Sequence, residues 1–173
     1  MSQTPIIIAE YDPDWPAQFD AETTDIRDAI GDHIERVEHI GSTAVPNLPA
    51  KPIIDMLAGV ASLEDAVECI EPLEKLGYEY VPSFEDVMPE RRYFRKTVGG
   101  TRTHHLHMVE TGREFWTRHL AFRNYLREHP AIADEYAALK RDLAEIHRND
   151  IGAYTDGKDE FIHRIEREAR TDS

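Results

Sequence analysis

One aspartate stands inside one of the most apolar stretches of the chain. Asp55 lies in the middle of residues 53–57 (IIDML). A carboxylate is costly to bury unless a cation, a hydrogen-bond donor or a shifted pKa compensates for it. We therefore predict that Asp55 is a catalytic residue and a metal ligand. The alternative is a strand end at which Asp55 meets water or an arginine.

A loop with a Gly-Ser pair precedes this aspartate. Gly41 has no Cβ, so its backbone can approach a ligand closely. Ser42 and Thr43 offer hydroxyl and backbone N–H groups that can bind phosphate oxygens. A Gly-Ser pair is also typical of a capped turn, but residues 43–54 alone separate this pair from Asp55. That position favours substrate binding by Gly41, Ser42 and Thr43.

Two histidines stand two residues apart in a strand-like segment. His105 and His107 would point to the same face of a strand, and His104 to the other face. Paired imidazoles can bind a divalent metal ion, or donate to a phosphate when they are protonated. The alternative is a sheet face of hydrogen-bonded histidines. We predict a metal site made by Asp55, His105 and His107, for Mg²⁺, Mn²⁺ or Zn²⁺.

Charge is unevenly spread along the chain. The 173 residues hold 20 Lys and Arg against 34 Asp and Glu, a net charge of −14. Such acidity makes nucleic acid an unfavourable partner, and it favours either a protein adapted to a salt-rich cytosol or an ordinary acidic bacterial protein. From Arg91 to Arg127, however, nine bases face two acids, a net of +7.

This basic block has two interpretations that the sequence leaves open. It can bind something anionic, or its arginines can pair with the protein's own acids. Arg92 and Arg95, which lie in the block beside a hairpin, are candidate substrate contacts. Tyr154 and Lys158, four residues apart near the start of the last helix, are two more.

The elements that would position these residues follow from the spacing of apolar side chains. Apolar residues recur at helical spacing over 13–30, 62–76, 115–126, 130–146 and 156–169, whereas 33–40, 52–60 and 78–81 are strand-like. Segments 92–98 and 103–110 predict a hairpin across Gly99-Gly100. We therefore predict a single α+β domain over 1–173, with a mixed sheet flanked by helices in 1–110 and a helical part in 111–173.

Other features disfavour several classes of protein. No apolar run approaches the roughly 18 residues that cross a bilayer, and Met1 to Ile8 lack the basic region of a secretory signal. The single cysteine, Cys69, cannot form an internal disulfide. We expect a cytoplasmic protein that does not enter membranes. The sequence leaves open whether the chain forms a homo-oligomer.

Taken together, these motifs resemble the signature of the GrpB family. The likeness is carried by residues 38–46 (EHIGSTAVP), 50–55 (AKPIID), 105–107 (HLH) and 122–127 (FRNYLR), and by Tyr154 and Lys158 near the end. Asn47 stands where glycine is usual. The resemblance implies a fold similar to the nucleotidyltransferase superfamily and adds Lys51 to the candidate substrate contacts. In some bacteria the family occurs fused to dephospho-CoA kinase.

The resemblance also implies a pattern of acids. In the superfamily a Gly-Ser loop precedes a strand with two acids two residues apart, and a third acid follows on a later strand. Gly41, Ser42 and Asp55 match the first part, but Leu57 occupies the place of the second acid. We therefore expect a metal-dependent nucleotidyl- or phosphoryl-transferase acting on a nucleotide or other phosphorylated small molecule. The alternative, which Leu57 favours, is an inactive regulatory module of the same fold that binds a nucleotide or a coenzyme precursor.

Overall fold

Residues 7–172 are described in a computed structural model, with side chains to residue 169. The chain order is α1 (Trp15–Ile30), β1 (Arg36–Ile40), the 3₁₀ turn η1 (Ser42–Ala44), β2 (Ile54–Val60), α2 (Asp65–Lys75), β3 (Tyr78–Tyr80), the 3₁₀ turn η2 (Pro82–Phe84), β4 (Arg91–Val98), β5 (Thr101–Glu110), α3 (Glu114–Glu128), α4 (Pro130–Ile146) and α5 (Ile151–Asp172). The α+β prediction is confirmed. Most of the segment predicted not to be a secretory signal lies outside the described residues.

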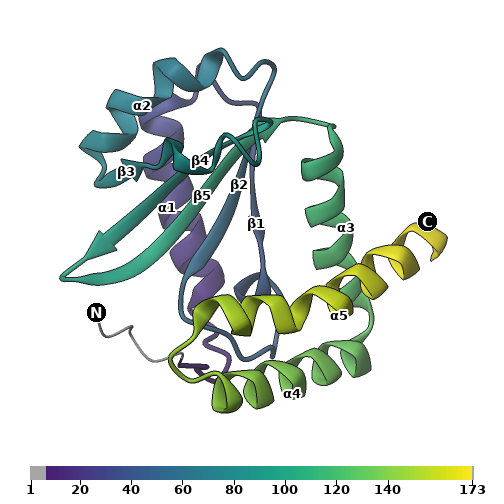
Figure 1. The fold of residues 1–173 in the computed structure, drawn as a ribbon. Helices are drawn as coiled ribbons and strands as arrows, with labels where there is room; N and C mark the ends of the chain where they lie inside the picture. The colour runs from purple at the N-terminus through teal and green to yellow at the C-terminus, as the bar shows by residue number, and fades with distance from the viewer. Residues whose placement is uncertain (1–6, 173) are drawn as a thin grey trace.

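The strands form one mixed sheet in the order β1-β2-β5-β4-β3 (Figure 1). The central pair, β2 and β5, is parallel, and each other neighbouring pair is antiparallel. The hairpin across Gly99-Gly100 is confirmed, and both glycines have positive φ, a conformation that side chains with a Cβ rarely adopt. The parallel pairing places Asp55 of β2 directly beside His105 of β5.

One face of the sheet is sealed by α1 and α2. Met56, Phe94 and Leu106 of the sheet are fully buried against Ile26 of α1 and Leu73 of α2. These residues recur at the period of their own element, about two in strands and 3.6 in helices, which is why the sequence pattern located these elements.

The opposite face is covered over only part of its area by α3. Leu57 and Val109 of the sheet pack there against Phe115 and Trp116 of α3. The last two helices, α4 and α5, cross the end of the sheet where β1 stops and β2 starts (Figure 1). Their own apolar cluster includes Tyr136, Phe161 and the loop residue Leu48. A cavity lined mainly by polar residues lies between this end of the sheet and the C-terminal helices.

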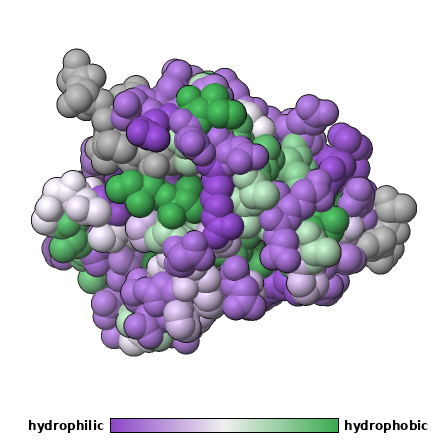
Figure 2. All heavy atoms as spheres, turned by 90° about the horizontal axis from the view of Figure 1, so that it is seen from below, coloured by the Kyte–Doolittle hydropathy of each residue, from purple (hydrophilic) through white to green (hydrophobic). Residues whose placement is uncertain are grey.

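Hydrophilic residues cover most of the face seen from below, and apolar residues form small separate patches on it (Figure 2). This surface agrees with a composition of 31% charged residues. None of the helices in residues 7–172 is long and apolar enough to cross a membrane.

Candidate functional site

A cavity of about 120 Å³ lies between the end of the sheet and the last two helices. The sheet contributes Asp55 and His105, the segment between β1 and β2 contributes one wall, and α4 and α5 close the other side. Its lining residues are Ser42, Thr43, Ala50, Lys51, Ile53, Asp55, His105, Lys140, Tyr154 and Lys158. Seven of the predicted site residues therefore meet in one place, although they come from four separate parts of the chain.

Asp55 is held by the two histidines. Its Oδ1 lies 3.1 Å from Nδ1 of His105 and 3.9 Å from Nε2 of His107. The side chain is 31% exposed, although its neighbours Ile54 and Met56 are buried. Burial by itself would raise the pKa of Asp55, but hydrogen bonds and charge from the two histidines outweigh it and hold the pKa well below its usual range. The carboxylate is therefore ionised at neutral pH.

Gly41 makes room for this carboxylate. Its φ is +74°, in the region that favours glycine. A Cβ added to Gly41 would lie 2.7 Å from Oδ2 of Asp55, far inside contact distance. The glycine of the Gly-Ser pair therefore serves the position of Asp55, whereas Ser42 and Thr43 line the cavity themselves.

The two histidines have different surroundings. His105 turns Nδ1 to Asp55, while its Nε2 is buried and has no hydrogen-bond partner among the described residues. His107 receives a hydrogen bond on Nδ1 from the guanidinium of Arg91 at 3.2 Å, so its proton sits on Nε2, which faces Asp55. Burial lowers the pKa of His107. Nδ1 of His107 therefore accepts from Arg91, and its Nε2 carries the proton, so neither nitrogen offers a free lone pair.

These donors do not fit a metal centre held by the protein. Asp55 and Nε2 of His105 are the two groups left to bind an ion, because neither nitrogen of His107 offers a free lone pair. Leu57, in the place of a second acid, is fully buried against Phe115 and Trp116. Across residues 7–172 there is no group of three His, Cys, Asp or Glu side chains arranged to hold a metal ion. A pair of magnesium ions needs more oxygen ligands than this.

Three lysines give the cavity its positive charge. The ammonium groups of Lys51 and Lys158 both lie against the ring of Tyr154, at 5.5 and 4.6 Å from its centroid. Lys140 lies 4.9 Å from the ring centroid of Tyr136 and is 2% exposed. Such contacts with aromatic faces are favourable for a cation. None of the three lysines has an acid within ion-pair distance among the side chains of residues 7–169.

The pKa values of all three lysines are lowered, because the ammonium groups are buried close to one another. Burial, followed by repulsion from Lys158 and Lys51, lowers the pKa of Lys140 from 10.5 to about 7. Burial and repulsion from Lys51 lower the pKa of Lys158 to about 8. Burial also lowers the pKa of Lys51, against the attraction of Asp55. An entering anion would relieve this repulsion, which makes the cavity receptive to negative charge.

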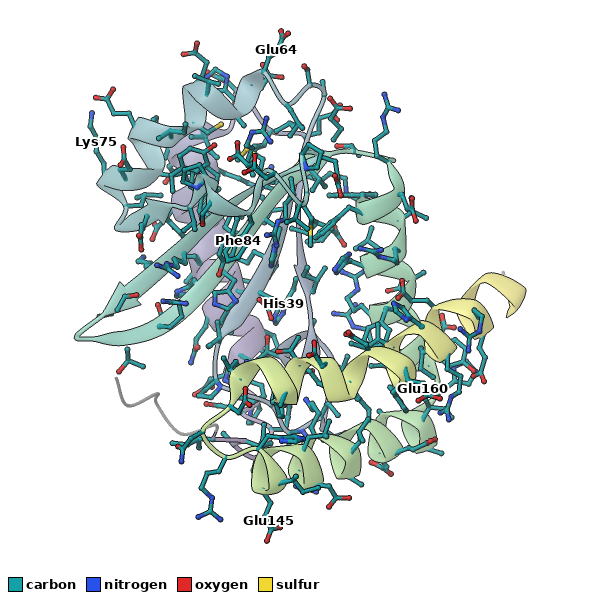
Figure 3. The ribbon with its side chains drawn as sticks, viewed as in Figure 1. His39, Glu64, Lys75, Phe84, Glu145 and Glu160 are labelled. Carbon is teal, nitrogen blue, oxygen red and sulfur yellow. The ribbon has the colours of Figure 1, made fainter. Side chains whose placement is uncertain are left out.

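The wall that carries Ser42 and Thr43 is fixed from several sides. His39, labelled in Figure 3, lies 2.8 Å from the hydroxyl of Thr43 and is stacked on Phe19. Burial lowers the pKa of His39 to about 4, so this imidazole is neutral. Arg127 of α3 donates to the carbonyl of Ala44 at 2.9 Å. The loop is therefore preorganised before any ligand arrives.

The basic block is largely neutralised by the protein itself. Arg92 lies 3.7 Å from Glu85, and Arg95 lies 2.9 Å from Glu79. Neither arginine lines the cavity, so the structure does not bring these two predicted substrate contacts to the site. Four more members of the block pair with acids: Lys96 with Glu22, Arg113 with Glu110, Arg118 with Glu166 and Arg123 with Glu38. For these six residues, pairing with the protein's own acids is the interpretation that the structure favours.

Lys140 is the site residue that the sequence analysis missed. It stands four residues after Tyr136 and three before Leu143, inside the buried stripe of α4. A lysine on the apolar face of an amphipathic helix is unusual unless its charge is used, and that position was the available signal.

The comparisons with known proteins agree with the architecture. The profile of the family described as GrpB protein matches residues 5–168. The chain belongs to the GrpB family. It is 46% identical over 160 residues to the YqkA protein of Bacillus subtilis, covering 92% of this chain and 46% of that one. It is 35% identical to the glutamate-rich protein GrpB of Alkalihalophilus pseudofirmus, covering 92% and 93%. The chain therefore spans about half of the first relative and nearly all of the second.

A solved GrpB structure has the same fold. The crystal structure of conserved protein GrpB from Enterococcus faecalis superposes with a TM-score of 0.86 at 46% identity, over 94% of this chain and 96% of that chain. A more distant likeness is to the Cid1 poly(U) polymerase with Mg 3′-dATP bound, with a TM-score of 0.57 at 14% identity over 87% and 49%. The nucleotidyltransferase-like fold is thereby confirmed.

A curated relative of different length has a name that describes an activity. The dephospho-CoA kinase of Mycolicibacterium paratuberculosis is 28% identical over 194 residues, which cover 98% of this chain and 47% of that protein. The segment similar to GrpB therefore makes up about half of that relative.

Proposed function

We propose that the GrpB cavity binds the phosphate of a nucleotide or another phosphorylated small molecule. The observation that carries this proposal is that three of the chain's five lysines line one cavity, without an acid paired to any of them in the described residues. Collecting ammonium groups in this way is unfavourable in the free protein, and a bound phosphate offsets the cost.

The size of the cavity limits which part of the ligand enters it. A volume of about 120 Å³ is well below the roughly 300–1,000 Å³ of pockets that enclose whole small molecules. Because a water molecule occupies about 30 Å³ in the liquid, the space equals about four waters. A phosphate group with a few attached atoms fits that space, and the remainder of a larger ligand then lies outside it.

Within the cavity the lysines and Asp55 have separate tasks. Lys51, Lys140 and Lys158 supply positive charge, while the hydroxyls of Ser42 and Thr43 offer donors to phosphate oxygens. Asp55 is ionised, so it repels the phosphate locally and restricts the orientations in which the group can enter. Its hydrogen bond to His105 fixes which nitrogen of that imidazole, Nε2, is left free.

The binding module is favoured over a transferase by the surroundings of Leu57. Transfer by a pair of magnesium ions requires several anionic ligands, and the second acid position is filled by a leucine packed into apolar side chains. A nucleotidyl- or phosphoryl-transferase remains the second candidate, because Asp55 stays ionised near the start of an inner strand of a sheet whose fold is shared with a polymerase.

The proposal is tested with matched ligands. Adenosine, AMP and ATP differ only in phosphate, and dephospho-CoA is added because of the name of the mycobacterial relative. Isothermal titration should give binding for the phosphorylated members and none for adenosine. The double variant Lys51→Met with Lys158→Met should lose that binding, and Lys75→Met, a change on the surface of α2, should keep it. Equal binding of adenosine and AMP would overturn the proposal.

The same ligands separate the two candidates. Each is incubated with Mg²⁺, Mn²⁺ or Zn²⁺, and the products are followed by chromatography. A binding module gives ligand-dependent thermal stabilisation with no product under any metal. Product that disappears in Asp55→Asn would establish the transferase instead.

A further inference from the structure

The chain's use of lysine is concentrated at the cavity. Of its 20 basic residues 15 are arginine and 5 are lysine, and three of those lysines are Lys51, Lys140 and Lys158. The other two are Lys75, which is 76% exposed on α2, and Lys96, which pairs with Glu22 at 3.0 Å. Arginine binds phosphate with two parallel hydrogen bonds but does not lose its proton. A buried lysine, unlike an arginine, can lose its proton, so it can supply a neutral amine as well as a charge.

Among the three, Lys140 has the most unfavourable position for a charge. It is 2% exposed, lies in the buried stripe of α4 and faces Lys51 and Lys158 across the cavity. Burial and these two neighbours bring its pKa to about 7. A pKa lowered this far leaves a share of the Lys140 side chains neutral near pH 7, and a neutral amine is a nucleophile.

The other two lysines are placed to hold a ligand beside it. Lys51 and Lys158 lie against the same ring, that of Tyr154, whereas Lys140 lies against the ring of Tyr136. Both lysines line the cavity, and repulsion from Lys51 lowers the pKa of Lys158, so we expect one phosphate in the cavity to meet both ammonium groups. Lys140 is left as the group that meets whatever is attached to that phosphate.

We propose that Lys140 is a carbonyl-reactive amine that condenses with a phosphorylated aldehyde or ketone whose phosphate is held by Lys51 and Lys158. This inference rests on the proposed phosphate site and names the substrate class of that site. The nitrogen of Lys140 attacks the carbonyl carbon and forms a C–N bond, and the carbonyl oxygen takes up the electron pair and a proton. The carbinolamine then loses that oxygen with the two hydrogens of the amine as one water, which leaves an imine. No oxidant or reductant is needed.

The test uses pyridoxal 5′-phosphate as the probe. The full chain is incubated with the probe near pH 7.5, the imine is reduced with borohydride, and the labelled lysine is identified by peptide mass spectrometry. We expect one label per chain, on Lys140, formed at least about tenfold faster than on the exposed Lys75. Lys75 and Lys96 serve as controls within the same molecule. Label on Lys75 or Lys158 at the rate of Lys140, or none on Lys140, would overturn the proposal.

Two variants and two competitors separate this inference from the phosphate site on which it rests. Lys140→Arg should lose the label and still bind inorganic phosphate, which is measured by titration. Lys51→Met with Lys158→Met should label as slowly with pyridoxal 5′-phosphate as the parent protein does with pyridoxal, which lacks the phosphate. Inorganic phosphate should slow labelling of the parent protein. Phosphate binding without label on Lys140 contradicts the reactive amine alone, whereas equal labelling by pyridoxal and its phosphate contradicts the phosphate site.

Discussion

Two carboxylates lie on opposite faces of the sheet, each beside a histidine of β5. Glu22 of α1 accepts hydrogen bonds from the hydroxyl of Tyr78 at 2.7 Å and from Lys96 at 3.0 Å, and His104 lies 3.7 Å away. Asp55 of β2 is held by His105 and His107 of β5. His104 and His105 are consecutive, so the alternation of a strand sends them to the two different carboxylates.

The two carboxylates differ in the balance of charge around them. Glu22 is 7% exposed, and Lys96 supplies the one positive charge that neutralises it. Burial alone would raise the pKa of Glu22, but these hydrogen bonds outweigh it and lower the pKa. Around Asp55 the cavity holds three lysines against one carboxylate. A carboxylate with matched partners stabilises the fold, and one with surplus cations nearby marks a place for a further anion.

The largest expected effect lies on the Glu22 side. Lys96→Met leaves Glu22 buried without its counter-charge and should reduce the free energy of unfolding by about 3 kcal/mol. Urea denaturation measures it, with Lys75→Met as the control, because the exposed Lys75–Glu71 pair should contribute well under about 1 kcal/mol. Ligand affinity should not change in either variant. A loss of affinity in Lys96→Met would mean that the two sites are not separate.

The next effect lies on the Asp55 side and concerns binding. Lys51→Met with Lys158→Met should weaken the binding of a phosphorylated ligand about 100-fold, or about 2.7 kcal/mol, because two charge-assisted contacts are lost. Titration calorimetry gives the affinity, and urea denaturation of the same variant should show no decrease in the free energy of unfolding. If the variant bound the ligand as tightly as the parent protein, the lysines beside Asp55 would not be an anion site, and Asp55 would not differ from Glu22 in this respect.

Replacing Lys140, the third lysine of the cavity, should stabilise the fold, whereas Lys96→Met destabilises it. The pKa of Lys140 is 10.5 in its ordinary state and about 7 in the folded protein, so the unfolded chain holds this proton more tightly. Folding is therefore penalised at and below pH 7, and the penalty disappears as the pH rises toward 10.5. That penalty is about 4 kcal/mol at pH 7, and the lost contact of the ammonium with the ring of Tyr136 offsets about 2 kcal/mol of it. Lys140→Met should therefore raise the free energy of unfolding by about 2 kcal/mol at pH 7 in phosphate-free buffer. Urea denaturation at pH 7 and pH 10 measures this increase in the free energy of unfolding. An equal increase at both pH values would contradict the prediction.

The smallest effect is the pH dependence of binding. Above pH 7 the free protein loses the proton of Lys158, whose pKa is about 8, and a phosphate held by Lys51 and Lys158 must restore it. The affinity should fall about tenfold between pH 7 and pH 9. The charged and titratable groups that face Lys140 are Lys51, Asp55, His105, Tyr136, Arg141, Tyr154 and Lys158.

Asp55 stays ionised throughout that range, and the pKa of Tyr154, raised by burial to about 12, keeps its hydroxyl neutral. The proton uptake on binding therefore comes from the lysines. Calorimetry in buffers of different ionisation enthalpy counts these protons. An affinity that stays constant from pH 7 to pH 9 would show that the lysines are charged in the free protein.

Local sequence patterns were sufficient to predict most of the fold. The alternation and helical spacing of apolar residues located the five strands and five helices of residues 7–172 to within a few positions at most ends. The last helix was the largest departure, because α5 starts at Ile151 and not at Asp156. Gly152 and Gly157 lower helix propensity there, but Gly157 packs against Leu143 so closely that a Cβ would lie 2.5 Å from its Cδ2.

The candidate site was predictable only in part. Three features could be identified from local sequence: an acid within an apolar run (Asp55), a Gly-Ser pair shortly before it, and two histidines two residues apart. The sequence could not predict that Arg95 pairs with Glu79 instead of facing the cavity, because this pairing depends on the register between β3 and β4. The same holds for the convergence of Lys51, Lys140 and Lys158, which follows from the way α4 and α5 cross the end of the sheet.

The most direct measurement is a crystal structure of the protein soaked with tungstate, an analogue of phosphate whose anomalous scattering identifies it. We predict an anomalous peak inside the cavity, within hydrogen-bond distance of Lys51 and Lys158, and no such peak in the Lys51→Met, Lys158→Met variant. Tungstate bound solely on the outer arginines, with water alone between the three lysines, would contradict a phosphate-binding function for this cavity.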